Sequence, residues 1–215
     1  MNQFNYSAIM AVKNGLPYIE SAINSILNQT LPAYEIILID DHSDDNSIKE
    51  VKRLFPSVGI YHSRGIGQAD ALNLGLSIST CDYVAFLDSD DLWSPSKQAM
   101  QIEILRNSKN FEYVSSGVRC FRGDLFRPTF SQDFMATKML GACTFRKSVF
   151  DTFGKFNSTT HSKVFTYEFF HRTRNLDHFE THTIELNRRI HDNNMWIKDR
   201  DQLIKSLFEL LREIK

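Results

Sequence analysis

The chain has 215 residues, enough for one α/β domain with a full core, alone or with a small appendage. Its 25 Lys and Arg residues nearly balance 26 Asp and Glu residues, so the net charge of −1 gives no basic field that would point to nucleic acid as a partner. The three cysteines, Cys81, Cys120 and Cys143, are widely spaced, which argues against a disulfide framework or a zinc ribbon and predicts reduced thiols in the cytoplasm. No apolar stretch of about 18 residues occurs, so we expect no integral membrane segment.

Strand-like and helix-like patterns alternate over the first hundred residues. Short apolar runs predict four strands, at 6–12, 35–39, 58–61 and 83–87. Apolar residues at helical spacing predict helices between them, at 17–27, 46–55 and 70–78. This alternating order implies right-handed crossovers, and it predicts an α/β fold with a largely parallel sheet flanked by helices.

Acidic residues follow two of these predicted strands. Asp40 and Asp41 end the second strand, and Asp88, Asp90 and Asp91 end the fourth. Ligands of open α/β sheets bind beyond the carboxyl ends of the strands, so we expect both clusters at one edge of the sheet. Carboxylates this close repel one another unless a cation lies between them, and hard oxygen ligands suit Mg²⁺ or Mn²⁺. The pattern predicts a divalent-metal site for a phosphorylated ligand; the alternative is an Asp-rich turn that caps the next helix.

Four segments carry a more specific pattern. They read SAINSILNQT at 21–30, EIILIDDHSD at 35–44, GQADALNLG at 67–75 and YVAFLDSDDLW at 83–93. In order and spacing this series resembles the signatures of family-2 glycosyltransferases with the GT-A fold. The resemblance is dense over residues 5–100 and thins to 141–146, 153–156 and 189–194. It implies a single GT-A (Rossmann-like) domain over 1–215, with a nucleotide-sugar-binding half at 1–100, an acceptor-side half at 101–198 and a terminal helix at 199–215.

The resemblance implies a site for the uridine of a UDP-sugar. Either Asp40 or Asp41 would accept a hydrogen bond from the uracil imide, and the other would cap the following helix. Relatives usually end the first strand in Pro-Thr-Tyr-Asn, whereas this chain reads Ala-Val-Lys-Asn. Two side-chain contacts to the nucleotide are therefore lost, and we expect the backbone of Ala11 and Val12, together with Asn14, to line this part of the site.

The same resemblance places residues around the sugar and the diphosphate. Gly67 would let the backbone approach the ligand closely. Asp70 would lie near the ribose and the donor sugar; alternatively it is a first-turn acid that complements the helix dipole. Many relatives carry Arg at the position of Leu72, so that basic contact is absent here.

The metal motif is Asp88-Ser89-Asp90. By resemblance, Asp90 would bind Mn²⁺ or Mg²⁺ directly, and Asp88 would face the ribose or the metal through water. Ser89 would lie against the nucleotide-sugar. His191 resembles a late His that completes the metal or diphosphate site in some relatives; the alternative is a surface or packing residue.

The catalytic base departs from the family pattern. Inverting relatives carry a Glu-Asp pair at the start of a helix, and alignment on Arg172 places that pair on Phe165 and Thr166, neither of which takes a proton near neutral pH. Glu168 is the only carboxylate of this segment and is the candidate catalytic residue. The alternatives are that Glu168 pairs with Arg172 four residues on, or that the base is missing.

The second half carries fewer signals. We expect a strand at 111–121, an irregular acceptor-side loop at 129–138 and an amphipathic helix at 200–215. The polar face of that helix mixes both charges, so it is expected to pack on the domain or on a second subunit, giving a homo-oligomer, rather than on a membrane.

Together these features predict a metal-dependent glycosyltransferase. A hexose would pass from a nucleoside diphosphate sugar, expected to be a UDP-sugar, to a glycan or other hydroxyl acceptor with inversion. One alternative is a nucleotidyltransferase, although residues 11–15 make a poor phosphate loop. The other is a UDP-sugar-binding protein with weak or lost transfer.

Overall fold

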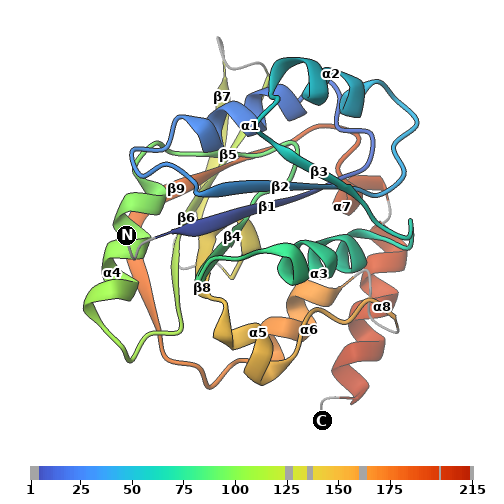
Figure 1. Cartoon of the computed structure of the whole chain (residues 1–215). Coiled ribbons are helices and arrows are strands. Elements are labelled where there is room, and N and C mark those ends of the chain that lie inside the picture. The colour runs from blue at the N-terminus through green and yellow to red at the C-terminus, as the bar shows by residue number, and fades with distance from the viewer. Residues whose placement is uncertain (1–4, 124–127, 135–137, 160–163, 199, 214–215) are drawn as a thin grey trace.

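The computed structural model describes residues 5–123, 128–134, 138–159, 164–198 and 200–213. Figure 1 shows helices on both faces of one central sheet. The strands are β1 (Tyr6–Val12), β2 (Glu35–Asp40), β3 (Gly59–His62), β4 (Tyr83–Phe86), β5 (Leu92–Trp93), β6 (Tyr113–Arg122), β7 (Thr129–Phe134), β8 (Cys143–Arg146) and β9 (His178–Arg189). The helices are α1 (Ile19–Leu27), α2 (Ser47–Leu54), α3 (Gln68–Ile78), α4 (Lys97–Asn107), α5 (Ser148–Phe153), α6 (Phe165–Arg172), α7 (Met195–Lys198) and α8 (Arg200–Glu213), with a 3-10 turn η1 at Leu140–Ala142.

The sheet joins a parallel half to a half built around a long strand pair. Its order is β3-β2-β1-β4-β8-β6-β9-β5, with β7 on β6. Strands β3, β2, β1 and β4 run parallel, as do β6 and β9, whereas β8, β7 and β5 pair antiparallel with their neighbours. The parallel half confirms the predicted α/β fold. Strands β2 and β4 lie on opposite sides of β1, so the order in which strands join the sheet reverses between β1 and β4. Such a switch point opens a crevice at the carboxyl ends of the strands.

Alternate residues of the parallel strands face two different cores. Met10, Leu38 and Ala85 face a core shared with α1, α2 and α4. Ile9, Ile37 and Phe86 face a second core shared with α3, α5 and α6. Both faces of these strands are therefore apolar, which explains why their sequence reads as continuous apolar runs and not as alternation.

A glycine sets the distance between α3 and the sheet. A Cβ on Gly75 would lie 2.4 Å from the Ile9 side chain of β1, so only glycine lets the helix pack this closely. The packing fixes α3 relative to β1, and the amino end of α3 thereby reaches the carboxyl edge of the sheet, where the predicted acids lie.

Two segments differ from the sequence-based expectation. Residues 129–134 form strand β7, which pairs with β6, instead of an irregular loop; residues 135–137 of that expected loop lie outside the described residues. The 12-residue β9 was not predicted, because its sequence is mostly polar and its pairing with β6 and β5 supplies the missing stabilisation. In the described part of the chain, no helix has both the length and the apolar character needed to cross a membrane.

Candidate active site

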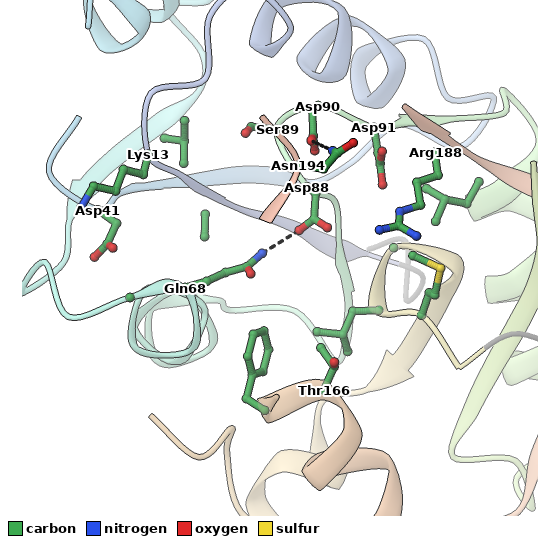
Figure 2. A pocket seen from close by; sticks show the side chains of 18 of the residues that line it. Lys13, Asp41, Gln68, Asp88, Ser89, Asp90, Asp91, Thr166, Arg188 and Asn194 are labelled. Carbon is green, nitrogen blue, oxygen red and sulfur yellow. Dashed lines mark hydrogen bonds between the residues drawn. The ribbon is translucent and has the colours of Figure 1, made fainter. Parts of the chain in front are cut away.

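A cleft of about 950 Å³ lies at the switch point between β1 and β4. Residues from both halves of the chain line it, and Figure 2 shows their side chains converging. The first half contributes Ala11, Val12, Lys13, Asp41, Gly65, Ile66, Gly67, Gln68, Asp88, Ser89, Asp90 and Asp91, and the second half contributes Lys138, Met139, Leu140, Gly141, Phe165, Thr166, Tyr167, Leu186, Arg188 and Asn194.

Three carboxylates gather just after β4. Oxygen atoms of Asp88, Asp90 and Asp91 all lie within 4.8 Å of one another. Desolvation by the surrounding protein, helped by the charge of Asp90, raises the pKa of Asp88 to about 6 and raises the pKa of Asp91 well above its usual value. The positive charge of Arg188 opposes both shifts. The cluster is therefore short of positive charge, as an acidic site built to hold a cation would be.

The donor set fits a hard divalent cation, because all three groups offer oxygen. Asp91 is buried and accepts a hydrogen bond from the Arg189 backbone N–H at 2.8 Å, so its carboxylate serves the fold. Asp88 lies within the cleft, where its side chain is accessible to solvent although protein surrounds it, and among the described residues it receives only the Gln68 amide, Nε2 to Oδ1 at 2.7 Å. All three acids line the cleft (Figure 2), and Asp88 and Asp90 are the more accessible carboxylates of the cluster.

His191 lies behind Asp90. Its Nδ1 accepts the backbone N–H of Asn193 at 3.2 Å, which places the ring proton on Nε2, and Nε2 donates to Asp90 Oδ2 at 2.9 Å. The Asn194 amide donates to the same oxygen at 3.1 Å, and the ring of Tyr18 packs on the imidazole at 4.7 Å between centroids. His191 therefore orients Asp90; to bind a metal itself it would have to release this proton. Its predicted ligand role stays a prediction.

Arg189 holds the loop that carries the acids. Its guanidinium lies between the rings of Tyr18 and Phe121, 4.6 Å from each centroid, and Nε donates to the Asp90 carbonyl at 3.0 Å. The side chain is buried, and the backbone N–H of the same residue binds Asp91. One residue of β9 thus fixes both the backbone and a carboxylate of the motif after β4.

The two acids after β2 have different surroundings. Asp40 accepts the backbone N–H of Ser43 at 2.9 Å and faces His62 Nδ1 at 3.1 Å, so it closes the loop after β2. Asp41 accepts the Ser63 hydroxyl and lines the cleft. Of the pair, Asp41 is the one that could contact a ligand in the cleft, and Asp40 stabilises the loop after β2.

The other predicted donor-site residues divide in the same way. Ala11, Val12, Ser89 and Gly67 line the cleft, and Gly67 has φ +118°, a conformation that favours glycine. By contrast, the Asn14 side chain accepts the backbone N–H of Asp44 at 2.9 Å, and Asn14 is not among the lining residues.

Asp70 also lies apart from the cleft lining. It is buried in the first turn of α3, and its carboxylate pairs with the guanidinium of Arg64. As the structure stands, this acid holds the loop before α3.

The lining residues that were not singled out from the sequence include the polar residues Lys13, Gln68, Arg188 and Asn194. Lys13 follows β1 directly, and Arg188 is the residue before Arg189 on β9. The strand pattern before position 13 offered a signal for Lys13. Arg188 could not be found because β9 itself was not recognised.

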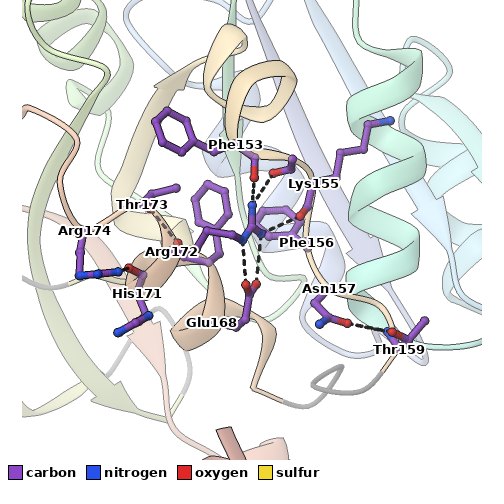
Figure 3. Close-up of polar contacts among 12 residues, drawn as sticks. Phe153, Lys155, Phe156, Asn157, Thr159, Glu168, His171, Arg172, Thr173 and Arg174 are labelled. Atoms are coloured by element: carbon purple, nitrogen blue, oxygen red, sulfur yellow. Dashed lines mark hydrogen bonds and ion pairs between the residues drawn. The ribbon is translucent and has the colours of Figure 1, made fainter. Parts of the chain in front are cut away.

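The side of the cleft that α6 forms carries less charge. Thr166 and Tyr167 of α6 line it, whereas Glu168 is not among the lining residues. The Glu168 carboxylate accepts two hydrogen bonds from Arg172, from Nε at 2.7 Å and from Nη2 at 3.1 Å. Figure 3 shows this guanidinium reaching on to the end of α5, where it donates to the carbonyls of residues 153–155. The expected pairing partner of Glu168 is thus present, and the catalytic role of Glu168 stays a prediction.

Comparison with known families decides the assignment. The family described as Glycosyl transferase family 2 matches residues 7–196. The chain belongs to glycosyl transferase family 2. The matched span includes all of the cleft residues described above, and it confirms the family resemblance of the sequence motifs.

Curated relatives of this family 2 chain are longer than the chain itself. It is 34% identical over 116 residues to the E. coli UDP-Glc:alpha-D-GlcNAc-diphosphoundecaprenol beta-1,3-glucosyltransferase WfgD, covering 53% of this chain and 46% of that protein. It is 37% identical over 106 residues to an uncharacterized glycosyltransferase of Nostoc sp., covering 47% of this chain and 33% of that protein. The chain thus spans less than half of the length of these relatives.

Solved structures show the same fold. S. aureus TarS 1–349 in complex with UDP superposes with a TM-score of 0.73 at 15% identity, over 98% of this chain and 64% of that chain. The TarS complex with UDP-GlcNAc gives 0.73 at 14% identity, over 94% and 64%. The predicted GT-A fold is confirmed.

Proposed function

We propose that this chain is a metal-dependent glycosyltransferase that moves a sugar, expected to be a hexose, from a UDP-sugar to a hydroxyl group of a glycan or other acceptor. The observation that supports this most is the convergence of Asp41, Asp88 and Asp90 on one cleft at the carboxyl ends of β2 and β4. Family membership favours sugar transfer over nucleotidyl transfer. The complexes of TarS with UDP and with UDP-GlcNAc support a uridine donor.

In this proposal the first half of the chain binds the nucleotide. Asp41 would accept the uracil imide N–H, since a carboxylate offers only acceptors. Ala11 and Val12 line the same end of the cleft, and Gly67 opens the amino end of α3 to the diphosphate. Lys13, at the cleft wall, adds a positive charge there.

The metal site of the proposal is formed by Asp88 and Asp90. Mn²⁺ or Mg²⁺ bound there would neutralise charge on the departing diphosphate. The protein keeps the two carboxylates in place: Gln68 donates to Asp88, and His191 and Asn194 donate to Asp90. His191 as a further ligand is part of the proposal and requires the loss of its Nε2 proton.

Inversion needs a group that takes the proton of the acceptor hydroxyl. Glu168 is the carboxylate of α6, and it is our candidate. Its carboxylate is held by Arg172, so it must leave this partner to reach the cleft. Thr166, which lines the cleft at the usual base position, has no proton-accepting group for neutral pH.

This arrangement also favours a second candidate function. Glu168 is held by two hydrogen bonds from Arg172, and Thr166 takes the usual base position in the cleft lining. Donor binding would then be intact while sugar transfer would be slow. The second candidate is therefore a UDP-sugar-binding protein with weak or lost transfer.

We also propose that the chain lies in the reducing cytoplasm, since Cys81, Cys120 and Cys143 are buried free thiols.

Donor hydrolysis tests the two candidates. A panel of UDP-hexoses is incubated with the protein in Mn²⁺ and in chelator, and released UDP is measured by mass spectrometry. The enzyme proposal expects slow, metal-dependent release that rises with a suitable hydroxyl acceptor. UDP binding without release supports the binding protein, and neither binding nor release contradicts both.

A further inference from the structure

Helix α8 has an apolar face that is largely exposed and belongs to none of the buried clusters of the described residues. One side of the helix, Leu203, Leu207 and Leu210, packs in a small cluster with Val164. Ile204, Phe208 and Leu211 lie on the next side, at spacings of four and three residues, and are 38%, 61% and 45% exposed. We refer to these three residues as the α8 face. Phe208 is the second most exposed of the large apolar side chains described.

Charged residues border the α8 face in a regular order. Asp201, Lys205, Glu209 and Arg212 are all exposed and recur every three or four residues, so they form one stripe beside the face. Their signs run minus, plus, minus, plus along the helix. Read in the opposite direction the order is plus, minus, plus, minus. The stripe is therefore complementary to an antiparallel copy of itself.

We propose that the α8 face pairs with the same face of a second copy of this chain, antiparallel and about a two-fold axis. A two-fold interface needs a surface that is complementary to itself, and here Asp201 would oppose Arg212 and Lys205 would oppose Glu209 of the other copy. Ile204 and Leu211 would meet across the axis, with Phe208 near its centre. This goes beyond the proposed sugar transfer and does not depend on it.

The position of α8 allows such pairing. Figure 1 shows α8 at the rim of the molecule beside α6, and the helix contributes no residue to the cleft lining. A helix of 14 residues is about 21 Å long, so the interface is small and the dimer should be weak, with a dissociation constant near the micromolar range. Membrane surfaces fit less well, since two of the four bordering charges are acidic.

Sedimentation equilibrium over a concentration series is the first test. The chain should pass from monomer to dimer, and Phe208→Glu should raise the dissociation constant by about 30-fold or more, as loss of a central aromatic anchor does. Tyr34→Glu is the matched control, since Tyr34 is 66% exposed in the segment before β2, away from α8. A monomer at every concentration up to about 1 mM, or a dimer unchanged by Phe208→Glu, overturns the proposal.

Charge reversal tests the antiparallel register. The Lys205→Glu chain carries two acids and the Glu209→Lys chain two bases at the paired positions, so each variant alone should dimerise less than the wild type. An equimolar mixture should restore dimerisation, since both cross-pairs become attractive. No gain on mixing contradicts the register. Binding of the chain to phosphatidylglycerol-containing vesicles that Phe208→Glu abolishes, with no dimer, would assign the face to a membrane instead.

Discussion

The two sides of the cleft are built differently. On the proposed donor side, each carboxylate after β4 is held by a neighbour: Asp88 by Gln68, Asp90 by His191 and Asp91 by the backbone of Arg189. On the proposed acceptor side, the carboxylate of α6 is not among the lining residues and pairs with Arg172.

This difference has a physical basis. The donor-side acids follow strands of a sheet whose two faces are both buried, so their backbone is fixed by strand pairing. The proposed acceptor side is built from a short helix, whose one acid pairs with Arg172, and Arg172 in turn ties α6 to the end of α5. The side chains of the proposed nucleotide and metal sites are thus held in place by the fold, whereas the proposed proton transfer would require a rearrangement.

The largest expected effect is that of Asp90→Asn. Removing the charge that faces both Asp88 and the proposed cation should lower the transfer or hydrolysis rate by about 10³-fold, since metal stabilisation of the leaving group is worth several kcal/mol. Rates with UDP-sugar in Mn²⁺ give the measurement. Asp82→Asn, at the opposite end of β4, is the control and should keep full activity. Equal rates for both variants would remove Asp90 from the site.

The acceptor side is tested by Glu168→Gln against Arg172→Gln. Both variants break the same ion pair, and Arg172→Gln also removes the bonds to the carbonyls of residues 153–155, so it should lose at least as much stability in thermal unfolding as Glu168→Gln. If Glu168 takes the proton, only Glu168→Gln should also lower the transfer rate, by at least about 10²-fold, with UDP affinity unchanged. Equal transfer rates for the two variants would make Glu168 a purely structural acid.

Thr166→Asp sharpens the same comparison from the other direction. It places a carboxylate in the cleft lining, where inverting relatives carry one, and we expect faster transfer than in the wild type. The initial rate with a working acceptor is the readout. No gain, with UDP affinity preserved, would show that the missing base is not what limits transfer.

Arg189 links β9 to the proposed metal motif, so its removal should weaken metal binding more than nucleotide binding. We expect Arg189→Met to weaken Mn²⁺ binding by about 10- to 100-fold, as is typical when the support of metal ligands is removed, and Arg189→Lys to recover part of it. Electron paramagnetic resonance of free Mn²⁺, without nucleotide, measures this. Arg122→Met, at an exposed position of β6, is the control. A lower melting temperature with unchanged Mn²⁺ affinity would limit Arg189 to a role in stability.

The smallest expected effect concerns selectivity for the nucleobase of the donor. Asp41→Asn should reduce the preference for UDP over CDP by about tenfold, since a hydrogen bond to a charged group is worth about 1.5–3 kcal/mol. Asp40→Asn should leave the preference unchanged and lower stability. Competition by UDP, CDP and GDP provides the test. The reverse result would exchange the roles assigned to the two acids.

The sequence predicted the parts that follow from strand periodicity. The acids after β2 and β4 were expected at one edge of the sheet, and Asp41, Asp88 and Asp90 do line one cleft. Which of Asp40 and Asp41 faces the cleft could not be predicted, because both follow the same strand and their partners Ser43 and Ser63 are set by loop geometry.

The second half was harder to predict for a related reason. Strand β9 is long but polar, and its partners β6 and β5 are far away in sequence, so Arg188 was not recognised and the structural role of Arg189, in the resembling segment 189–194, was not predicted. The ion pair of Glu168 with Arg172 was foreseen as an alternative from their spacing of four residues. Its bonds to the end of α5 depend on tertiary packing alone.

Calorimetric titration of UDP in the presence of Mn²⁺ and in chelator tests the central claim most directly, because it measures the nucleotide site and the metal site together. The account predicts saturable UDP binding that weakens at least about tenfold when the metal is removed, corresponding to 1.4 kcal/mol or more. UDP affinity that is the same with and without metal, or the absence of UDP binding in either condition, would contradict it.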